Sequence, residues 1–173
     1  RDLGLSVQAG ATYADTQVED FTAADLANPS RFPALSLLPG QSLGFAPEWS
    51  LSGAVTYERD LLENLRFLAS LNGKYQSSYN TGSDLSPFKK QDGFAVFNGR
   101  IGIGSKDERW TLEGWAQNLF DEDYYQVVFA APLQGQFIPT GSTTYSPATD
   151  SNTYNAFLGA PRTFGATLRL KFQ

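Results

Sequence analysis

The sequence predicts an all-β protein, namely a partial transmembrane β-barrel of about six antiparallel strands in a meander with long extracellular loops. Three observations lead to this fold class. Six segments alternate apolar and polar residues, their connections are alternately long and short, and aromatic residues gather at the strand ends. Transmembrane barrels combine these three features.

The last segment shows the alternation most clearly. From Thr163 to Phe172, Phe, Ala and Leu residues occupy one parity, and Thr, Gly, Arg and Lys residues occupy the other. Successive side chains of a strand point to opposite faces, so this segment has an apolar and a polar face. A soluble sheet would turn the apolar face to a core, whereas an outer-membrane barrel would turn it to lipid.

Five earlier segments alternate in the same way. They cover residues 3–13, 48–58, 65–76, 93–104 and 110–117. The pattern has irregularities, because Leu68 interrupts the polar side of the third segment, and Phe94 and Val96 share the polar parity of the fourth. The long connections lack a clear period and are predicted to be loops at residues 14–46, 77–92 and 118–160. The short turns are predicted at 59–63 and 105–109.

Charges inside the predicted strands keep to the polar parity. They are Glu58, Arg66, Lys74, Arg100, Glu113, Arg169 and Lys171. An Arg or Lys exposed to lipid at mid-depth would cost about 2–4 kcal/mol, so this segregation favours a membrane barrel. We expect the apolar set to lie exposed on a convex face, and this set is Leu51, Val55, Leu71, Ile101, Leu112 and Leu168.

Aromatic residues of the apolar parity lie near the two ends of the predicted strands, where barrels carry aromatic girdles. The expected outer belt is Tyr13, Trp49, Tyr75 and Phe164, and the expected inner belt is Tyr57, Phe67, Trp110 and Phe172. The alternative is a soluble antiparallel β-sheet module that binds a small apolar ligand. That alternative predicts that the apolar set is buried in a protein core.

Composition excludes several classes of function. The 173 residues include no Cys and no His, which excludes a disulfide scaffold, a thiolate metal site and a Ser-His-Asp triad. A net charge of −5 argues against nucleic acid as a partner. The longest apolar run, residues 127–133, is far shorter than a membrane helix needs. We therefore expect no enzyme, no cofactor and no metal. Because Met is absent even at position 1, we expect a processed chain or a fragment.

Three motifs resemble the C-terminal barrel of the TonB-dependent outer-membrane receptors. The first is Asn118-Leu119-Phe120-Asp121 followed by Asp123-Tyr124-Tyr125. The second is the segment from Gly159 to Gly165, which precedes the closing aromatic Phe172, and the third is Ala46-Pro47-Glu48-Trp49-Ser50. Their order along the chain matches that family.

The resemblance implies the identity of the surrounding protein. The family's barrel has about 22 strands and an N-terminal plug. We expect residues 1–173 to be the C-terminal segment of such a barrel, with the plug and the remaining strands absent. The implied function is energy-coupled uptake of a scarce nutrient, such as an iron–siderophore complex, across the outer membrane of a Gram-negative bacterium. The implied partners are outer-membrane lipid, the plug and remaining strands, the TonB complex through the missing N-terminal part, and the barrel-assembly machinery at the C-terminal strand.

Candidate site residues are few, and none is assigned to catalysis, to a cofactor or to a metal. Asp121-Glu122-Asp123 offers carboxylates that suit calcium, but a solvated turn is the preferred interpretation. Asn118 and Asp121 are expected to bind local backbone and fix the start of the loop. Gly102 and Gly104 are expected to permit strand bending rather than to bind phosphate.

The final loop carries aromatics that either stack on a ligand or pack on one another, and both options stay open. They are Phe129, Phe137, Tyr145 and Tyr154. By parity, Arg100, Arg169 and Lys171 are expected to point into the lumen, where a plug would lie. We expect the last strand to be an unpaired edge. The residues that contact the ligand are not identified by the sequence.

Overall fold

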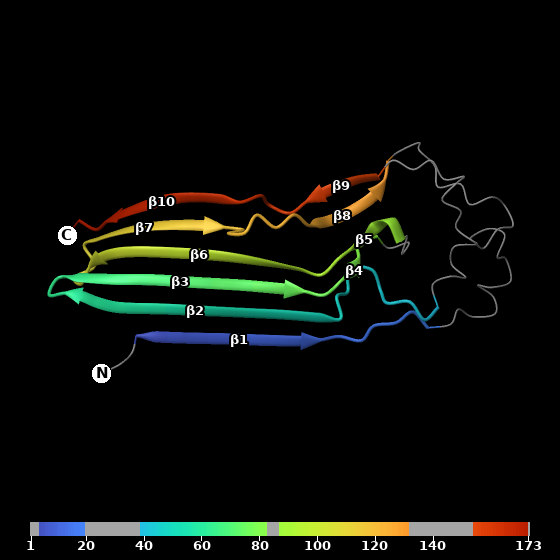
Figure 1. Ribbon diagram of the computed structural model, residues 1–173, viewed down its shortest axis with the longest axis horizontal. Coiled ribbons are helices and arrows are strands. Elements are labelled where there is room, and N and C mark those ends of the chain that lie inside the picture. The colour runs from blue at the N-terminus through green and yellow to red at the C-terminus, as the bar shows by residue number, and fades with distance from the viewer. Residues whose placement is uncertain (1–3, 20–38, 83–86, 132–153, 173) are drawn as a thin grey trace, which may run out of the picture.

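The described part of the chain forms one six-stranded antiparallel sheet and two small hairpins (Figure 1). The structure is a computed structural model that describes residues 4–19, 39–82, 87–131 and 154–172. Its large sheet has the order β1-β2-β3-β6-β7-β10. These strands are β1 (Leu5–Tyr13), β2 (Trp49–Leu62), β3 (Leu65–Gln76), β6 (Phe94–Ser105), β7 (Trp110–Gln117) and β10 (Thr163–Leu170). The predicted meander of six strands is therefore confirmed.

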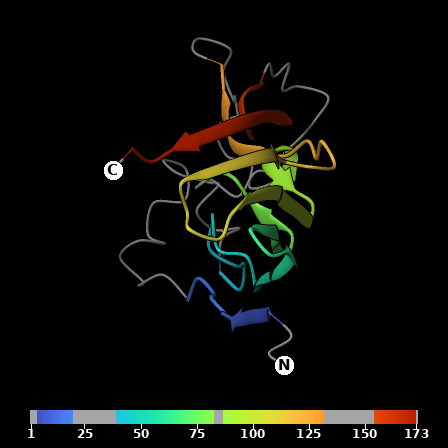
Figure 2. The ribbon, with the colours of Figure 1, turned by 90° about the vertical axis from the view of Figure 1, so that its left-hand side faces the viewer.

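The register aligns residues of the same kind across all six strands. One row of Cα partners consists of Val7, Val55, Leu71, Gly99, Ala116 and Phe164. The adjacent row consists of Ser6, Thr56, Ser70, Arg100, Trp115 and Gly165. Adjacent rows point to opposite faces, and we call these the apolar face and the polar face. Viewed nearly along the strands, the sheet follows an arc rather than a plane (Figure 2).

The apolar face is open to the surroundings. All six residues expected to be exposed are at least 40% exposed, from Val55 at 40% to Leu168 at 60%. A soluble module would have buried this set, so the observed exposure agrees with the barrel interpretation. No helix among the described residues has the length and apolar character to cross a membrane.

The first short connection is shorter than predicted. The ladder between β2 and β3 continues to the pair Leu62 and Leu65, with an irregularity between Asp60 and Leu62. Most of the predicted turn at 59–63 is therefore strand. This extension places Arg59 on the apolar face opposite Phe67, at the end of the sheet that carries the short turns. At a strand end, a long Arg side chain can reach past the apolar region to water.

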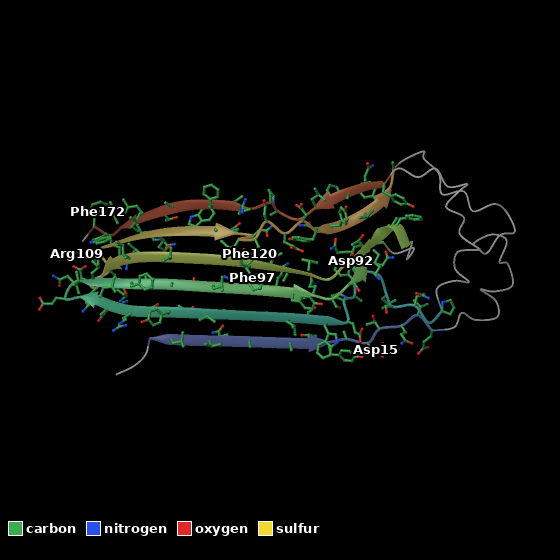
Figure 3. All side chains as sticks on the ribbon, in the orientation of Figure 1. Asp15, Asp92, Phe97, Arg109, Phe120 and Phe172 are labelled. Atoms are coloured by element: carbon green, nitrogen blue, oxygen red, sulfur yellow. The ribbon has the colours of Figure 1, made fainter. Side chains whose placement is uncertain are left out.

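The two ends of the sheet differ in character (Figure 3). The short turns lie at one end, the turn end, where Arg109 and Phe172 are found. The long connections leave the other end, the loop end, where Asp15 and Asp92 are found.

The two hairpins at the loop end correct the prediction that residues 77–92 and 118–160 are loops throughout. β4 (Tyr79–Asn80) pairs with β5 (Lys90–Gln91), which follows a 3-10 turn at Pro87–Lys89. β8 (Tyr125–Ala130) pairs with β9 (Tyr154–Leu158). β8 contains adjacent valines and two aromatic residues, which favour a strand, but its partner is distant in sequence and no local pattern identifies it.

Most of the buried side chains gather at the loop end. Phe94 is 3% exposed and Val96 is 8% exposed, although both belong to the polar parity. The ring of Phe94 stacks on Tyr124, with ring centroids 4.3 Å apart. This packing explains the irregular pattern of the fourth predicted strand, because the loop end of β6 is covered by the segment that follows β7.

Candidate functional site

A polar groove lies on the polar face, over the middle of β3, β6, β7 and β10. Its volume is about 330 Å³. Its lining includes Ser70, Asn72, Asn98, Arg100, Glu113, Trp115, Gln117, Thr167 and Arg169. These residues converge because every second residue of each strand faces the same side and the register aligns them.

Glycines on the polar face make room for the larger side chains of this groove. The indole of Trp115 lies against Gly165, where an added Cβ would come within 2.6 Å of the indole Cζ2. The Trp115 Nε1 donates a hydrogen bond to the Thr167 hydroxyl at 3.1 Å. Gly102 similarly lies close to the side chain of Glu113, whose Cγ would be 2.9 Å from an added Cβ. These glycines thus serve close approach between strands.

The groove contains both charge signs. The Arg100 Nη1 lies 3.7 Å from the Glu113 Oε2, and Glu113 is only 8% exposed. Arg169 makes no ion pair with any other described residue, so the groove has a surplus positive charge. The expectation that Arg100 and Arg169 share one face is confirmed by their common groove.

Lys171 differs from the expectation that it joins Arg100 and Arg169. It lies beyond the end of β10, where its Nζ is 2.8 Å from the Glu108 Oε2 in the turn between β6 and β7. Its backbone N–H donates to the Arg109 carbonyl oxygen at 2.8 Å. The hydrogen bond and charge of Lys171 lower the pKa of the exposed Glu108 carboxyl, so this ion pair is present at neutral pH and is lost as the pH falls through that lowered pKa.

The motif that begins at Asn118 forms a second cluster at the loop end. The Asn118 side chain accepts a hydrogen bond from the Glu122 N–H at 2.9 Å and donates to the Glu122 carbonyl oxygen at 2.9 Å. Asp121 accepts from the Arg162 N–H at 3.0 Å. Asn118 and Asp121 both adopt positive φ angles, 48° and 58°. The expected binding of local backbone is confirmed for Asn118, whose side chain bonds Glu122. The Asp121 carboxylate instead binds the distant backbone of Arg162, just before β10.

The geometry gives Asp121, the first residue of the acidic triplet, a structural role. One Asp121 oxygen binds the Arg162 backbone, and the other lies 3.5 Å from the Arg162 guanidinium. Within the described ranges, no group of three or more acidic, His or Cys residues is placed to hold a metal ion.

Aromatic contacts were only partly predictable. The ends of β1 and β2 bring Tyr13 and Trp49, two residues of the expected outer belt, to 4.8 Å between ring centroids. In the last loop, Phe129 packs on Phe157 at 5.7 Å. The remaining loop aromatic in the described part, Tyr154, stacks on Phe88 at 5.8 Å, which favours self-packing for these residues. Phe137 and Tyr145 lie outside the described residues.

Two residues of these clusters, Trp115 and Tyr124, were not predicted as site residues. Trp115 shares its parity with Thr111 and Glu113, so the alternation alone could have placed it on the polar face. The Lys74 ammonium lies over the Tyr124 ring, 5.9 Å from its centroid. This contact joins residues far apart in the sequence, so only the tertiary structure reveals it.

Taken together, the open apolar face, the polar groove and the meander define a segment of a β-barrel wall. Comparison with known families gives a match to the TonB dependent receptor-like β-barrel family over residues 1–119, which include β1, β2, β3, β6 and β7. The chain belongs to this family. Members of the family are receptors and transporters rather than enzymes, which agrees with the expectation from composition.

A solved structure supports the same fold. The chain is similar to the ferric yersiniabactin uptake receptor FyuA from Yersinia pestis, with a TM-score of 0.57 and 17% sequence identity. The similarity covers 75% of this chain and 17% of the FyuA chain, so the protein spans about a sixth of that receptor's length. A search of curated proteins found no match. At this identity, the likeness concerns the fold alone.

Proposed function

We propose that the chain is the C-terminal part of an outer-membrane receptor for energy-coupled uptake of a scarce nutrient, such as an iron–siderophore complex. One observation carries the proposal: a member of a receptor barrel family presents an open apolar face on one side of the sheet and a polar groove on the other. In this proposal, the apolar face contacts the lipid of a Gram-negative outer membrane. The polar face lines the barrel interior.

The edges of the sheet support the presence of further strands in the working protein. Within the described residues, β1 pairs only with β2, and β10 pairs only with β7. Unpaired backbone groups in lipid cost several kcal/mol each, so a membrane sheet must close on itself. We propose that the remaining strands and a plug complete the barrel and that the TonB complex acts through the N-terminal part. The barrel-assembly machinery would bind the C-terminal strand.

The suggestion of an iron–siderophore complex comes from the resemblance to the receptor family. It is consistent with the similar fold of FyuA, which is a ferric yersiniabactin uptake receptor. The alternative, a soluble module for a small apolar ligand, requires a buried apolar face. The observed exposure and the family membership both favour the receptor.

The proposal is tested in the source bacterium by deleting the gene and measuring uptake of radioactive iron from a panel of ferric siderophores. We expect the protein in the outer-membrane fraction, with heat-modifiable mobility, and we expect the deletion to abolish uptake of one siderophore. Complementation with the intact gene should restore that uptake. Recovery of the protein in the soluble fraction would contradict the membrane location, and unchanged uptake of every siderophore would contradict this class of nutrient.

A further inference from the structure

The connection between β7 and β10 is closed at its base by side chains. β7 ends at Gln117 and β10 begins at Thr163, and the residues between them include the β8–β9 hairpin, which lies beyond the end of both strands (Figure 1). Residues 118–124 and 159–162 meet at this base. Their contacts are made by a set that we call the register latch: Asn118, Asp121, Tyr124, Gly159, Ala160 and Arg162.

Asn118 is the centre of the register latch. It is 3% exposed, and its Nδ2 donates to the Ala160 carbonyl oxygen at 3.0 Å in addition to its bonds with Glu122. Its backbone N–H donates to the Asn98 Oδ1 at 3.0 Å, which ties the latch to β6. A buried amide in this setting is costly to leave without partners, so the position of Ala160 relative to Asn118 is strongly specified.

Two further contacts fix the same segment. The Asp121 carboxylate binds both the backbone N–H and the guanidinium of Arg162. The Gly159 N–H donates to the Tyr124 carbonyl oxygen at 2.8 Å. The Tyr124 ring packs so closely on Gly159 that an added Cβ would collide with it. Three independent contacts therefore hold residues 159–162 just before β10 begins.

The alternating apolar residues of the two strands specify this register only weakly. In β10, Phe164, Ala166 and Leu168 share the apolar face, so a shift by two residues would keep apolar side chains on that face. A tight turn would normally fix the register of a hairpin, but the connection between β7 and β10 is long. In the observed register, Ala166 lies opposite Gly114, and after a two-residue shift it would lie opposite Ala116.

We propose that the register latch sets the register of β10 against β7 and so determines how the last strand joins the sheet. A two-residue shift would break the contacts of Asn118, Asp121 and Tyr124 at once. It would also move Trp115 away from Gly165 on the polar face, while the apolar face would lose little. The latch thus supplies the specificity that the alternating sequence lacks. This inference is independent of the nutrient that the protein takes up.

Disulfide trapping measures the register directly, because residues 1–173 contain no cysteine that would compete with an introduced pair. Cysteines at Gly114 and Ala166 report the observed register, since these residues are direct Cα partners. Cysteines at Ala116 and Ala166 report the shifted register. In the observed register these two residues are diagonal neighbours about 7–8 Å apart, which is too far for an unstrained disulfide. Each pair is introduced into the complete gene product, membranes are oxidised with copper–phenanthroline, and cross-linked product is quantified by mass spectrometry.

Two variants remove latch side chains without straining the backbone. Asn118→Gly and Asp121→Gly keep the positive φ angles that glycine adopts readily. We expect Asn118→Gly to lower the ratio of observed-register to shifted-register cross-link about tenfold. Loss of the Asn118 side chain leaves the buried polar groups that it binds without partners. We expect Asp121→Gly to lower the ratio about threefold, because its contacts are exposed. Phe45→Gly is the matched control, since Phe45 has a φ of 61° in a different loop, and its ratio should not change.

Asp121→Gly keeps the test decisive if Asn118→Gly fails to fold, because the Asp121 variant retains the buried Asn118 side chain. If Asn118→Gly does not accumulate, a lowered ratio in Asp121→Gly still supports the proposal, and an unchanged ratio there overturns it. An unchanged ratio in both latch variants likewise overturns the proposal. An equal fall of the ratio in Phe45→Gly would show that any loss of stability alters the register, and this result would also overturn the proposal.

Discussion

At the scale of single residues, glycines on the polar face determine where large side chains can lie. Gly165 has no side chain, and the Trp115 indole fills the space beside it and reaches Thr167. Gly114 is one position along the same pair of strands, yet a Cβ added there would meet only the Ile101 carbonyl oxygen at 4.0 Å. Two glycines in adjacent rows of the sheet, Gly165 on the polar face and Gly114 on the apolar face, therefore differ in the space around them.

This difference gives a prediction for Gly165→Ala. The new methyl group must displace Trp115 and break its hydrogen bond to Thr167, so we expect a loss of about 1–3 kcal/mol in the free energy of unfolding. Gly114→Ala is the control and should be neutral or stabilising by up to about 1 kcal/mol, because its site is open. Denaturant unfolding with tryptophan fluorescence checks both variants, and equal stabilities would show that the Trp115 contact is unimportant.

At the scale of elements, the alternating pattern was sufficient for the six long strands but not for the hairpins. A two-residue alternation is a local property of the sequence. It predicted both the order in which the strands pair and the common face of Arg100 and Arg169. The β8–β9 hairpin and the burial of Phe94 depend on contacts between segments far apart in sequence, which no local pattern carries. Motif residues such as Asn118 were correctly given a backbone-binding role, but their link to residues 159–162 required the fold.

The end of the last strand yields a second prediction. Phe172 is 90% exposed at the turn end, and the neighbouring Lys171 is held by Glu108. Phe172→Asp would place a charge where the expected inner aromatic belt meets the lipid boundary, so we expect reduced membrane insertion and a protease-sensitive species in the periplasm. Heat-modifiable mobility in membrane fractions measures assembly.

Lys171→Gln is the control for that substitution. It removes an exposed ion pair of small energetic value and keeps the backbone hydrogen bond to Arg109. The variant should therefore assemble almost normally. Equal assembly of the Phe172→Asp and Lys171→Gln proteins would refute an assembly role for the terminal aromatic.

At the scale of the whole molecule, the central feature is a sheet with two chemically distinct faces. The exposed apolar residues include Leu71 at 43%, Ile101 at 59% and Leu168 at 60%. A soluble protein rarely leaves so large a contiguous apolar surface uncovered. The opposite face holds Arg100, Glu113 and a polar groove, which suits an aqueous interior. Both faces are explained if the sheet is part of a membrane barrel wall.

The most direct test of this account measures which solvent each face contacts. Single cysteines carrying nitroxide spin labels are introduced at Leu71, Ile101 and Leu168 on the apolar face, and at Ser52, Ser70 and Asn72 on the polar face. Power saturation then compares collisions with oxygen, which concentrates in lipid, and with a water-soluble nickel chelate. We predict high oxygen and low nickel accessibility at the apolar positions of the membrane-embedded protein, and the reverse at the polar positions. Nickel access at both sets, or protection of the apolar set from both reagents, would contradict the barrel wall.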